Sequence, residues 1–183
     1  MEHGTLAARI RETDYRPFLL TLYGLVCYAA DSGSRYSPED ALIPGGYAGE
    51  GNKYSFSSVV NSVLQPTLGL RWLLCYEDSD KPLVHLQKAA PCEWFAPGEH
   101  IDVGRCPTRF GEISWRTESH AKAWKITLRV PPHFAADILI HVHPASRAPL
   151  TSTSLGSIQG TAVHLTQGDL NSAKEISIDV RSG

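Results

Sequence analysis

Cysteine is scarce in this sequence, and its few cysteines are not spaced as metal ligands. The 183 residues include four of them, which lie far apart and form no Cys-x-x-Cys pair: Cys27, Cys75, Cys92 and Cys106. A structural zinc site needs ligands at short, regular spacing, so the sequence predicts no metal and no cofactor. Nothing in it calls for disulfides, and the thiols in apolar runs are expected to behave as small buried hydrophobic groups.

An excess of one charge and a long apolar run are also lacking. The 17 Lys and Arg residues nearly balance the 19 Asp and Glu residues, which gives a formal net charge of -2. Nucleic-acid binding needs a clustered basic surface, so we do not expect a nucleic-acid partner. The longest apolar run, 18–30, is interrupted by Thr21, Tyr23 and Gly24, so we expect no membrane span. The first residues lack the pattern of a signal peptide, and the compartment stays open.

Helix and strand patterns divide the sequence near residue 80. Apolar residues recur at helical spacing over 14–30 and again over 57–76, which predicts two helices joined by a long loop, 31–56. Beyond residue 80 the pattern alternates with a period of two in short segments, with one helical turn at 90–95. The predicted strands are 83–88, 100–103, 111–118, 123–130, 137–142, 161–165 and 175–180.

The fold class predicted from these segments is mainly β. Short strands separated by turns indicate an antiparallel β-sandwich of six to eight strands, preceded by two α-helices. The predicted domains are a helical segment, 1–80, and a sandwich domain, 81–183. Apolar residues surround most of each helix, and such helices need several neighbours. The helical segment therefore resembles the end of a larger helical array.

Two stretches of the sequence carry a resemblance to a known family. They are LVHLQKAAPCEWFAPGEHI at 83–101 and CPTRFGEIS at 106–114. Together they resemble the C-terminal region of bacterial six-hairpin glycosidases, a superfamily that includes α-L-rhamnosidase-like enzymes. The later segments ILIHVHP, 138–144, and PASRAPL, 144–150, are similar to a late strand and turn of that family.

The resemblance implies a catalytic barrel of paired helices followed by a β-sandwich, and it identifies the helical segment as the end of that helical barrel. The chain has two predicted helices, far fewer than such a barrel needs. We therefore expect the C-terminal portion of a glycoside hydrolase, whose sandwich braces a barrel that is largely missing here and which is inactive alone. Its expected partners are a carbohydrate and the missing barrel portion or another chain.

Glycosidic cleavage needs two carboxylates that flank the scissile bond. The long loop contains Glu39 and Asp40 together with Tyr36 and Tyr47, and tyrosine offers a sugar both a stacking face and a hydroxyl group. We expect these four residues to bind substrate, and we assign no catalytic residue. The segment Ser37-Pro38-Glu39-Asp40 also has the pattern of a helix start, which is the competing interpretation.

Other residues are weaker candidates. His141 and His143 alternate on one strand and lack a third ligand at fixed spacing, so we expect surface residues. Trp115 and Trp124 share a face with isoleucines and are expected in the core, whereas Trp94 lies outside this pattern. Arg109 is expected to anchor the loop between the sandwich and the helices.

Two further functions stay open. A stand-alone carbohydrate-binding module predicts an exposed aromatic strip on one face of the sandwich. A structural or assembly domain without catalysis predicts apolar helix faces that bind another chain.

Overall fold

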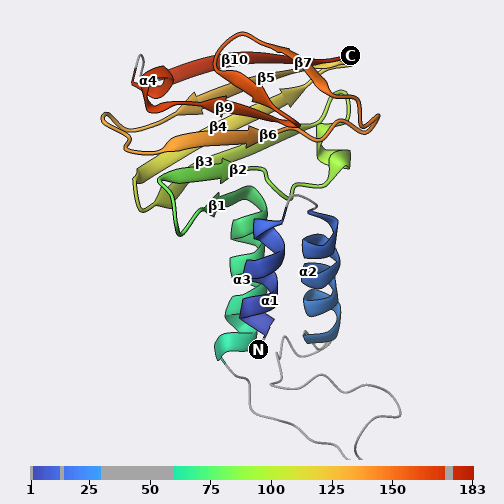
Figure 1. The fold of residues 1–183 in the computed structure, drawn as a ribbon. Helices are drawn as coiled ribbons and strands as arrows, with labels where there is room; N and C mark the ends of the chain where they lie inside the picture. Colours follow the sequence, from blue (N-terminus) through green and yellow to red (C-terminus); the bar gives the residue numbers. More distant parts are fainter. Residues whose placement is uncertain (1, 13–14, 30–59, 172–174) are drawn as a thin grey trace, which may run out of the picture. The chain divides into compact units, whose positions relative to one another are not determined.

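The computed structural model describes residues 2–12, 15–29, 60–171 and 175–183 (Figure 1). The chain divides into two compact units, 1–72 and 73–183, which are described separately below.

The first unit is helical in its described part. Its helices are α1 (Glu2–Arg11), α2 (Arg16–Ala29) and α3 (Val60–Leu74). Helices α1 and α2 pack together through buried Leu6, Ile10, Phe18 and Leu22. A Cβ atom at Gly69 of α3 would meet the Leu22 side chain, so the glycine allows the close approach of α3 to α2. No helix of the described residues is long and apolar enough to cross a membrane.

Helices α2 and α3 confirm the two predicted helices. Helix α1 was not predicted, because ten residues with apolar side chains only at Leu6, Ile10 and a few small alanines carry a weak helical pattern. It is stabilised by burial of Leu6 and Ile10, which is a tertiary effect.

The second unit holds two five-stranded sheets in its described part, which confirms a mainly β fold. Sheet A contains, in spatial order, β1 (Cys75–Glu77), β2 (Leu83–Leu86), β6 (Asp137–His141), β9 (Ala162–Leu165) and β8 (Ser157–Gln159). Sheet B contains β3 (His100–Thr108), β4 (Gly111–Ser119), β5 (Ala123–Arg129), β10 (Glu175–Ser182) and β7 (Leu150–Thr153). Two short helices, η1 (Cys92–Phe95) and α4 (Gln167–Leu170), connect strands.

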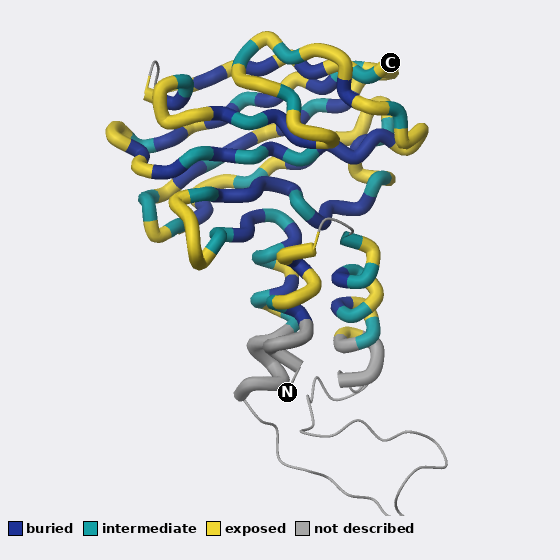
Figure 2. Tube along the Cα trace, viewed as in Figure 1, coloured by how far each residue is buried: buried dark blue, intermediate teal, exposed yellow. Residues whose placement is uncertain are grey.

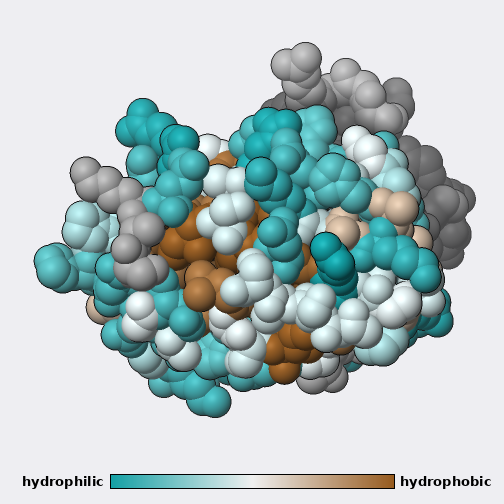
Figure 3. Space-filling view, turned by 90° about the horizontal axis from the view of Figure 1, so that it is seen from above, coloured by the Kyte–Doolittle hydropathy of each residue, from teal (hydrophilic) through white to brown (hydrophobic). Residues whose placement is uncertain are grey.

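The core lies between the sheets and follows the alternation of side chains. Buried and exposed residues alternate along the strands of sheet B (Figure 2). Trp115 and Trp124 are both buried, as predicted, and the indole nitrogen of Trp124 donates to the carbonyl oxygen of Phe95 at 3.2 Å. Seen from above, apolar side chains lie among hydrophilic ones (Figure 3).

The predicted hairpin of β4 and β5 is confirmed, and Ser119 pairs with Trp124 next to its turn. Two features of sheet A differ from the prediction. Cys75 and Tyr76, predicted at the end of a helix, form β1, because pairing of Cys75 with Leu86 and of Tyr76 with His85 outweighs local helix propensity. Strands β2 and β6 are parallel within the otherwise antiparallel sandwich.

Strands β7 and β8 were not predicted either. Their sequences, LTST and SIQ, have too few apolar residues for a strand pattern. Pairing of β7 with β10 and of β8 with β9 places both strands at sheet edges. Strand β10 lies far from β7 in the sequence, and β9 follows β8 across a turn.

Two glycines in the turns that flank β8 provide a matched test of this part of the fold. Gly156 and Gly160 both have left-handed backbone, with φ of 75° and 62°. A Cβ atom at Gly156 would collide with the carbonyl oxygen of His164, whereas one at Gly160 would meet nothing within 4 Å. Gly160→Ala is expected to cost about 1 kcal/mol from backbone strain alone. Gly156→Ala adds overpacking and is expected to cost about 3 kcal/mol or more.

Urea unfolding of both variants measures these losses. Equal losses in the two variants would show that the contact with the His164 carbonyl has no energetic weight.

Candidate functional site

The substrate-binding residues expected from the sequence, Tyr36, Glu39, Asp40 and Tyr47, lie within 30–59, outside the described residues. Two clusters of polar and titratable side chains are described in the sandwich. One lines a pocket on sheet B, and the other crosses sheet A.

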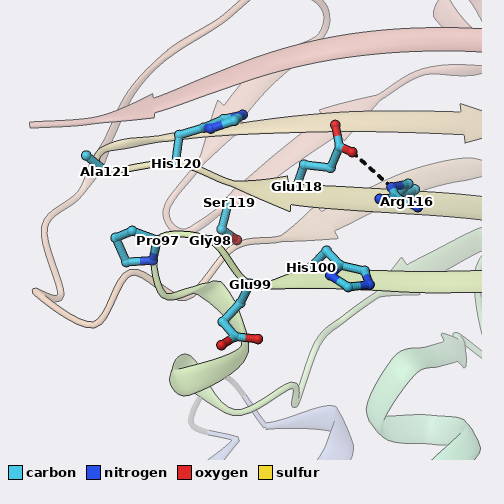
Figure 4. A pocket seen from close by; sticks show the side chains of 9 residues that line it. All are labelled: Pro97, Gly98, Glu99, His100, Arg116, Glu118, Ser119, His120 and Ala121. Carbon is cyan, nitrogen blue, oxygen red and sulfur yellow. Dashed lines mark hydrogen bonds and ion pairs between the residues drawn. The ribbon is translucent and has the colours of Figure 1, made fainter.

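The pocket lies where the start of β3 meets the turn between β4 and β5, and it has a volume of about 500 Å³ (Figure 4). Residues 97–100 form one side, and Arg116 and residues 118–121 form the other. Backbone hydrogen bonds hold the two sides together: Gly98 N donates to Ser119 O at 2.9 Å, and Ser119 N donates to Glu99 O at 3.0 Å. Gly98 adopts φ of 89°, a value that favours glycine, so the chain turns into β3 here.

Charged side chains of the pocket are mostly paired with one another. The Arg116 guanidinium lies 3.1 Å from an oxygen of Asp102 and 3.0 Å from an oxygen of Glu118. All three side chains are exposed enough for water to screen the pairs, so they orient the pocket wall more than they stabilise the fold. The carboxylates of Glu99 and Glu118 point in different directions in Figure 4.

A pair of carboxylates that cleaves a glycosidic bond must face that bond from two sides. Glu99 and Glu118 do not have this arrangement. The pocket offers hydrogen-bonding groups for a polar ligand. Sequence analysis missed it, because its residues come from two segments whose approach depends on sheet pairing.

Histidines form the second cluster, which is the middle of a row of aromatic rings across the outward side of sheet A. The Nδ1 atom of His85 on β2 lies 3.0 Å from the Nε2 atom of His141 on β6. The ring centroids of His141 and His143 lie 6.1 Å apart. Tyr76 lies beside His85 at one end of the row, with ring centroids 5.7 Å apart, and Phe95 beside His143 at the other, at 5.6 Å. We call these rings the aromatic row.

The expectation that His141 and His143 are surface residues was wrong. His143 is buried and His141 half-buried, because His85 packs beside them after parallel pairing of β2 with β6. A polar residue within the apolar run Leu83–Leu86 is the signal in the sequence that marks His85 as unusual. Among the described residues, no group of three or more His, Cys, Asp or Glu side chains is arranged to hold a metal ion.

Burial keeps the histidines of the row neutral. The pKa of His85 is lowered to about 4, chiefly by burial and to a smaller extent by nearby Lys88, while Asp78 opposes the shift. Burial, with smaller contributions from His85, His143 and Lys88, holds the pKa of His141 well below its usual range. Burial also lowers the pKa of His143, against the effect of the backbone carbonyl groups of Lys88 and Gln87.

The hydrogen bonds of His143 determine its tautomer. Its Nε2 atom lies 3.2 Å from the carbonyl oxygen of Gln87 and 3.1 Å from that of Lys88. A carbonyl oxygen only accepts, so Nε2 carries the proton and donates it. The neutral ring therefore has its lone pair on Nδ1.

Gln87, which accepts from His143, also joins the two sheets. It is fully buried, and its Nε2 atom donates to the Thr117 hydroxyl of β4 at 2.6 Å. Its Oε1 atom, the Trp115 indole nitrogen and the Ser119 hydroxyl have no hydrogen-bond partner among the described residues. Such buried polar atoms are commonly satisfied by ordered water, so this end of the core is polar.

Arg109 differs in part from its expected role. It anchors a loop, but this loop lies between β1 and β2 inside the second unit. Its guanidinium donates to the carbonyl oxygens of Asp78 and Lys81 and lies over the Phe110 ring, 4.7 Å from the centroid.

No protein-family model, curated protein or solved structure matches the chain. The resemblance to six-hairpin glycosidases therefore stays a prediction.

Substitution of Thr117 tests the hydrogen bond between the sheets. Thr117→Val keeps the shape of the side chain but leaves the buried Nε2 group of Gln87 without its acceptor. An unpaired buried donor costs about 1–3 kcal/mol, so we expect a loss of this size in urea unfolding. Thr117→Ser retains the hydroxyl and is the control, with an expected loss of about 1 kcal/mol for the missing methyl group. A larger loss in the serine variant would contradict the importance of this bond.

Proposed function

We propose that this chain is the C-terminal portion of a glycoside hydrolase and that its sandwich braces a catalytic helical barrel supplied by further helices. The observation that carries the proposal is an apolar face on α2. Leu20, Tyr23 and Val26 are 73%, 54% and 42% exposed, and their spacing of three places them on one side of the helix. Leu70 of α3 is also exposed.

Covering exposed apolar residues with another apolar surface stabilises the complex by about 25 cal/mol per Å² of buried apolar area. Single exposed apolar side chains are common on proteins, but several on one helix face mark a contact surface. Side chains spaced three or four residues apart on a helix form the ridges and grooves through which helices pack. Further helices of a barrel are therefore the occupant that we propose for this face.

The sandwich is proposed as a non-catalytic part of the enzyme. Its pocket contains Glu118, which is paired with Arg116, and Glu99, which points elsewhere. We propose that the catalytic carboxylates come from the barrel. Tyr36, Glu39, Asp40 and Tyr47 remain our proposed substrate contacts, as the composition of their loop indicates.

The alternative functions have less support. A stand-alone carbohydrate-binding module needs exposed aromatic platforms. Among the described residues of the sandwich, Trp94 is the one large apolar side chain that is exposed, to 39%. A structural or assembly domain uses the same apolar helix face, and an activity measurement on the extended enzyme distinguishes it from our proposal.

The apolar face of α2 predicts self-association of the isolated chain. We expect sedimentation velocity to show a concentration-dependent dimer or larger species. Replacing both Leu20 and Tyr23 with Lys is expected to raise the dissociation constant at least about tenfold, since burial of such side chains contributes more than about 1.4 kcal/mol. Glu12→Lys, at an exposed position directly after α1, is the control and should have no effect. A monomeric wild-type chain that binds an oligosaccharide by itself would favour the binding-module alternative.

The glycosidase itself is tested by expressing the reading frame extended upstream of the Met1 codon. We expect this longer polypeptide to contain helical-hairpin repeats and to hydrolyse aryl glycosides. An extended polypeptide that folds but cleaves no glycoside would instead support the assembly function.

In the extended enzyme, Glu39→Gln tests the proposed substrate contact. Loss of a charge-assisted hydrogen bond, about 1.5–3 kcal/mol, should raise KM by roughly tenfold or more, with little change in kcat. Glu12→Gln is the matched control, because it removes an exposed carboxylate that interacts with Arg9. An unchanged KM would remove Glu39 from the binding site, and a collapse of kcat would make it a catalytic residue.

A further inference from the structure

The aromatic row connects parts of the sandwich that are remote in the sequence. His85 belongs to β2, His141 to β6, and Phe95 to η1. Parallel pairing aligns β2 with β6, and the two histidines are linked by the 3.0 Å contact between their ring nitrogens. His143 then ties the end of β6 to the backbone of residues 87 and 88. The row thus acts as a side-chain link across sheet A, in addition to the backbone ladders.

The contact between His85 and His141 requires that at least one of the two rings is neutral. One ring of the pair His85 and His141 must present a lone pair to accept the hydrogen bond from the other. If both rings were protonated, both nitrogens would be donors 3.0 Å apart, and two positive charges would face each other inside the protein. A protonated His143 would lie next to them, 6.1 Å from His141 between ring centroids.

The charged groups around the row do little to compensate. Lys88 lies with its ammonium group 5.4 Å from the Tyr76 ring centroid and adds a positive charge next to the row. Asp78, from the β1–β2 loop, is the carboxylate that attracts His85, but it is only half-buried and accepts a hydrogen bond from Asp80 N at 2.8 Å.

The other groups beside the row are uncharged rings or a carboxylate that is already paired. Tyr76 lies beside it on β1 and Phe95 on η1. On the outward side of β6 and β9, Asp137 is engaged by His164 at 3.1 Å and by Gln167 N at 3.0 Å.

We propose that His85, His141 and His143 form an acid-sensitive latch, which holds sheet A closed while the rings are neutral and releases it when they take up protons. The latch is independent of the proposed glycosidase function, because all its parts lie in the sandwich.

The direction of the pH dependence follows from where the protons bind. In the unfolded chain a histidine takes up a proton near pH 6.5. In the folded chain burial lowers the pKa of His85 to about 4. Between these values the unfolded state binds more protons, so stability is full above about pH 7 and is lost as the pH falls.

Urea unfolding at pH 7.5 and at pH 5.0 tests the latch. His85 alone is expected to lower the equilibrium constant for folding roughly 30-fold between these two values, and His141 and His143 add to this loss. The lower limit of pH 5.0 lies above the range in which ordinary carboxylates take up protons, so the histidines dominate the change.

Variants assign the loss to the row. In the double variant His85→Gln and His141→Gln, the ratio of the folding equilibrium constants at pH 7.5 and pH 5.0 should be at least about tenfold smaller than in the wild-type chain. This expectation holds whatever the stability of the variant at pH 7.5. His120→Gln is the control, because His120 is exposed in the β4–β5 turn, and it should leave the difference unchanged.

An imidazole NMR titration of the intact chain keeps the proposal testable if the double variant does not fold. We expect the ring of His85 to stay neutral down to pH 5 and the rings of His141 and His143 to titrate below the ordinary range of histidine. Titration of all three near pH 6.5 in the folded chain would overturn the latch. A stabilisation by Zn²⁺ at pH 7.5 that His141→Gln abolishes would also overturn it, because the row would then be a metal site.

Discussion

Gln87 is the residue on which one end of the sandwich depends. It follows β2 with a left-handed backbone, φ of 60°, that costs a non-glycine residue roughly 1–2 kcal/mol. Its backbone N–H donates to Leu74 O at 2.7 Å, its carbonyl oxygen accepts from His143, and its side chain donates to Thr117 of the opposite sheet. These bonds offset the strain, and they set the positions of the aromatic row and of the chain that leads to η1.

The outward sides of the two sheets differ in chemistry because they differ in exposure. On sheet B, Arg116 and Arg129 pair with carboxylates in water, where such pairs contribute little to stability. On sheet A, the outward side carries buried or half-buried histidines whose neutral state burial enforces. The first surface suits contact with polar ligands, whereas the second carries the proposed acid-sensitive latch.

Local pattern was sufficient for much of the fold. Alternation in 111–118 and 123–130 predicted β4, β5 and their hairpin, because each strand buries one face and exposes the other. The pattern of apolar residues did not predict those strands that form only because they pair with a neighbouring strand. Cys75–Glu77 continues a helical pattern but joins β2, and Leu150–Thr153 has one apolar residue but joins β10. His141 and His143 were noticed, yet their burial depends on His85, which lies more than fifty residues earlier in the sequence.

The sequence by itself determined the mainly β class, the preceding helices and the core tryptophans, because these follow from the periodicity of apolar side chains over a few residues. Tertiary structure alone decided the parallel pairing of β2 with β6, the pocket between 97–100 and 116–121, and the aromatic row. Each of these brings together segments that are separated along the chain, and their contact depends on strand order and register. Neither is encoded in local periodicity, since the same alternating strand can pair with several partners.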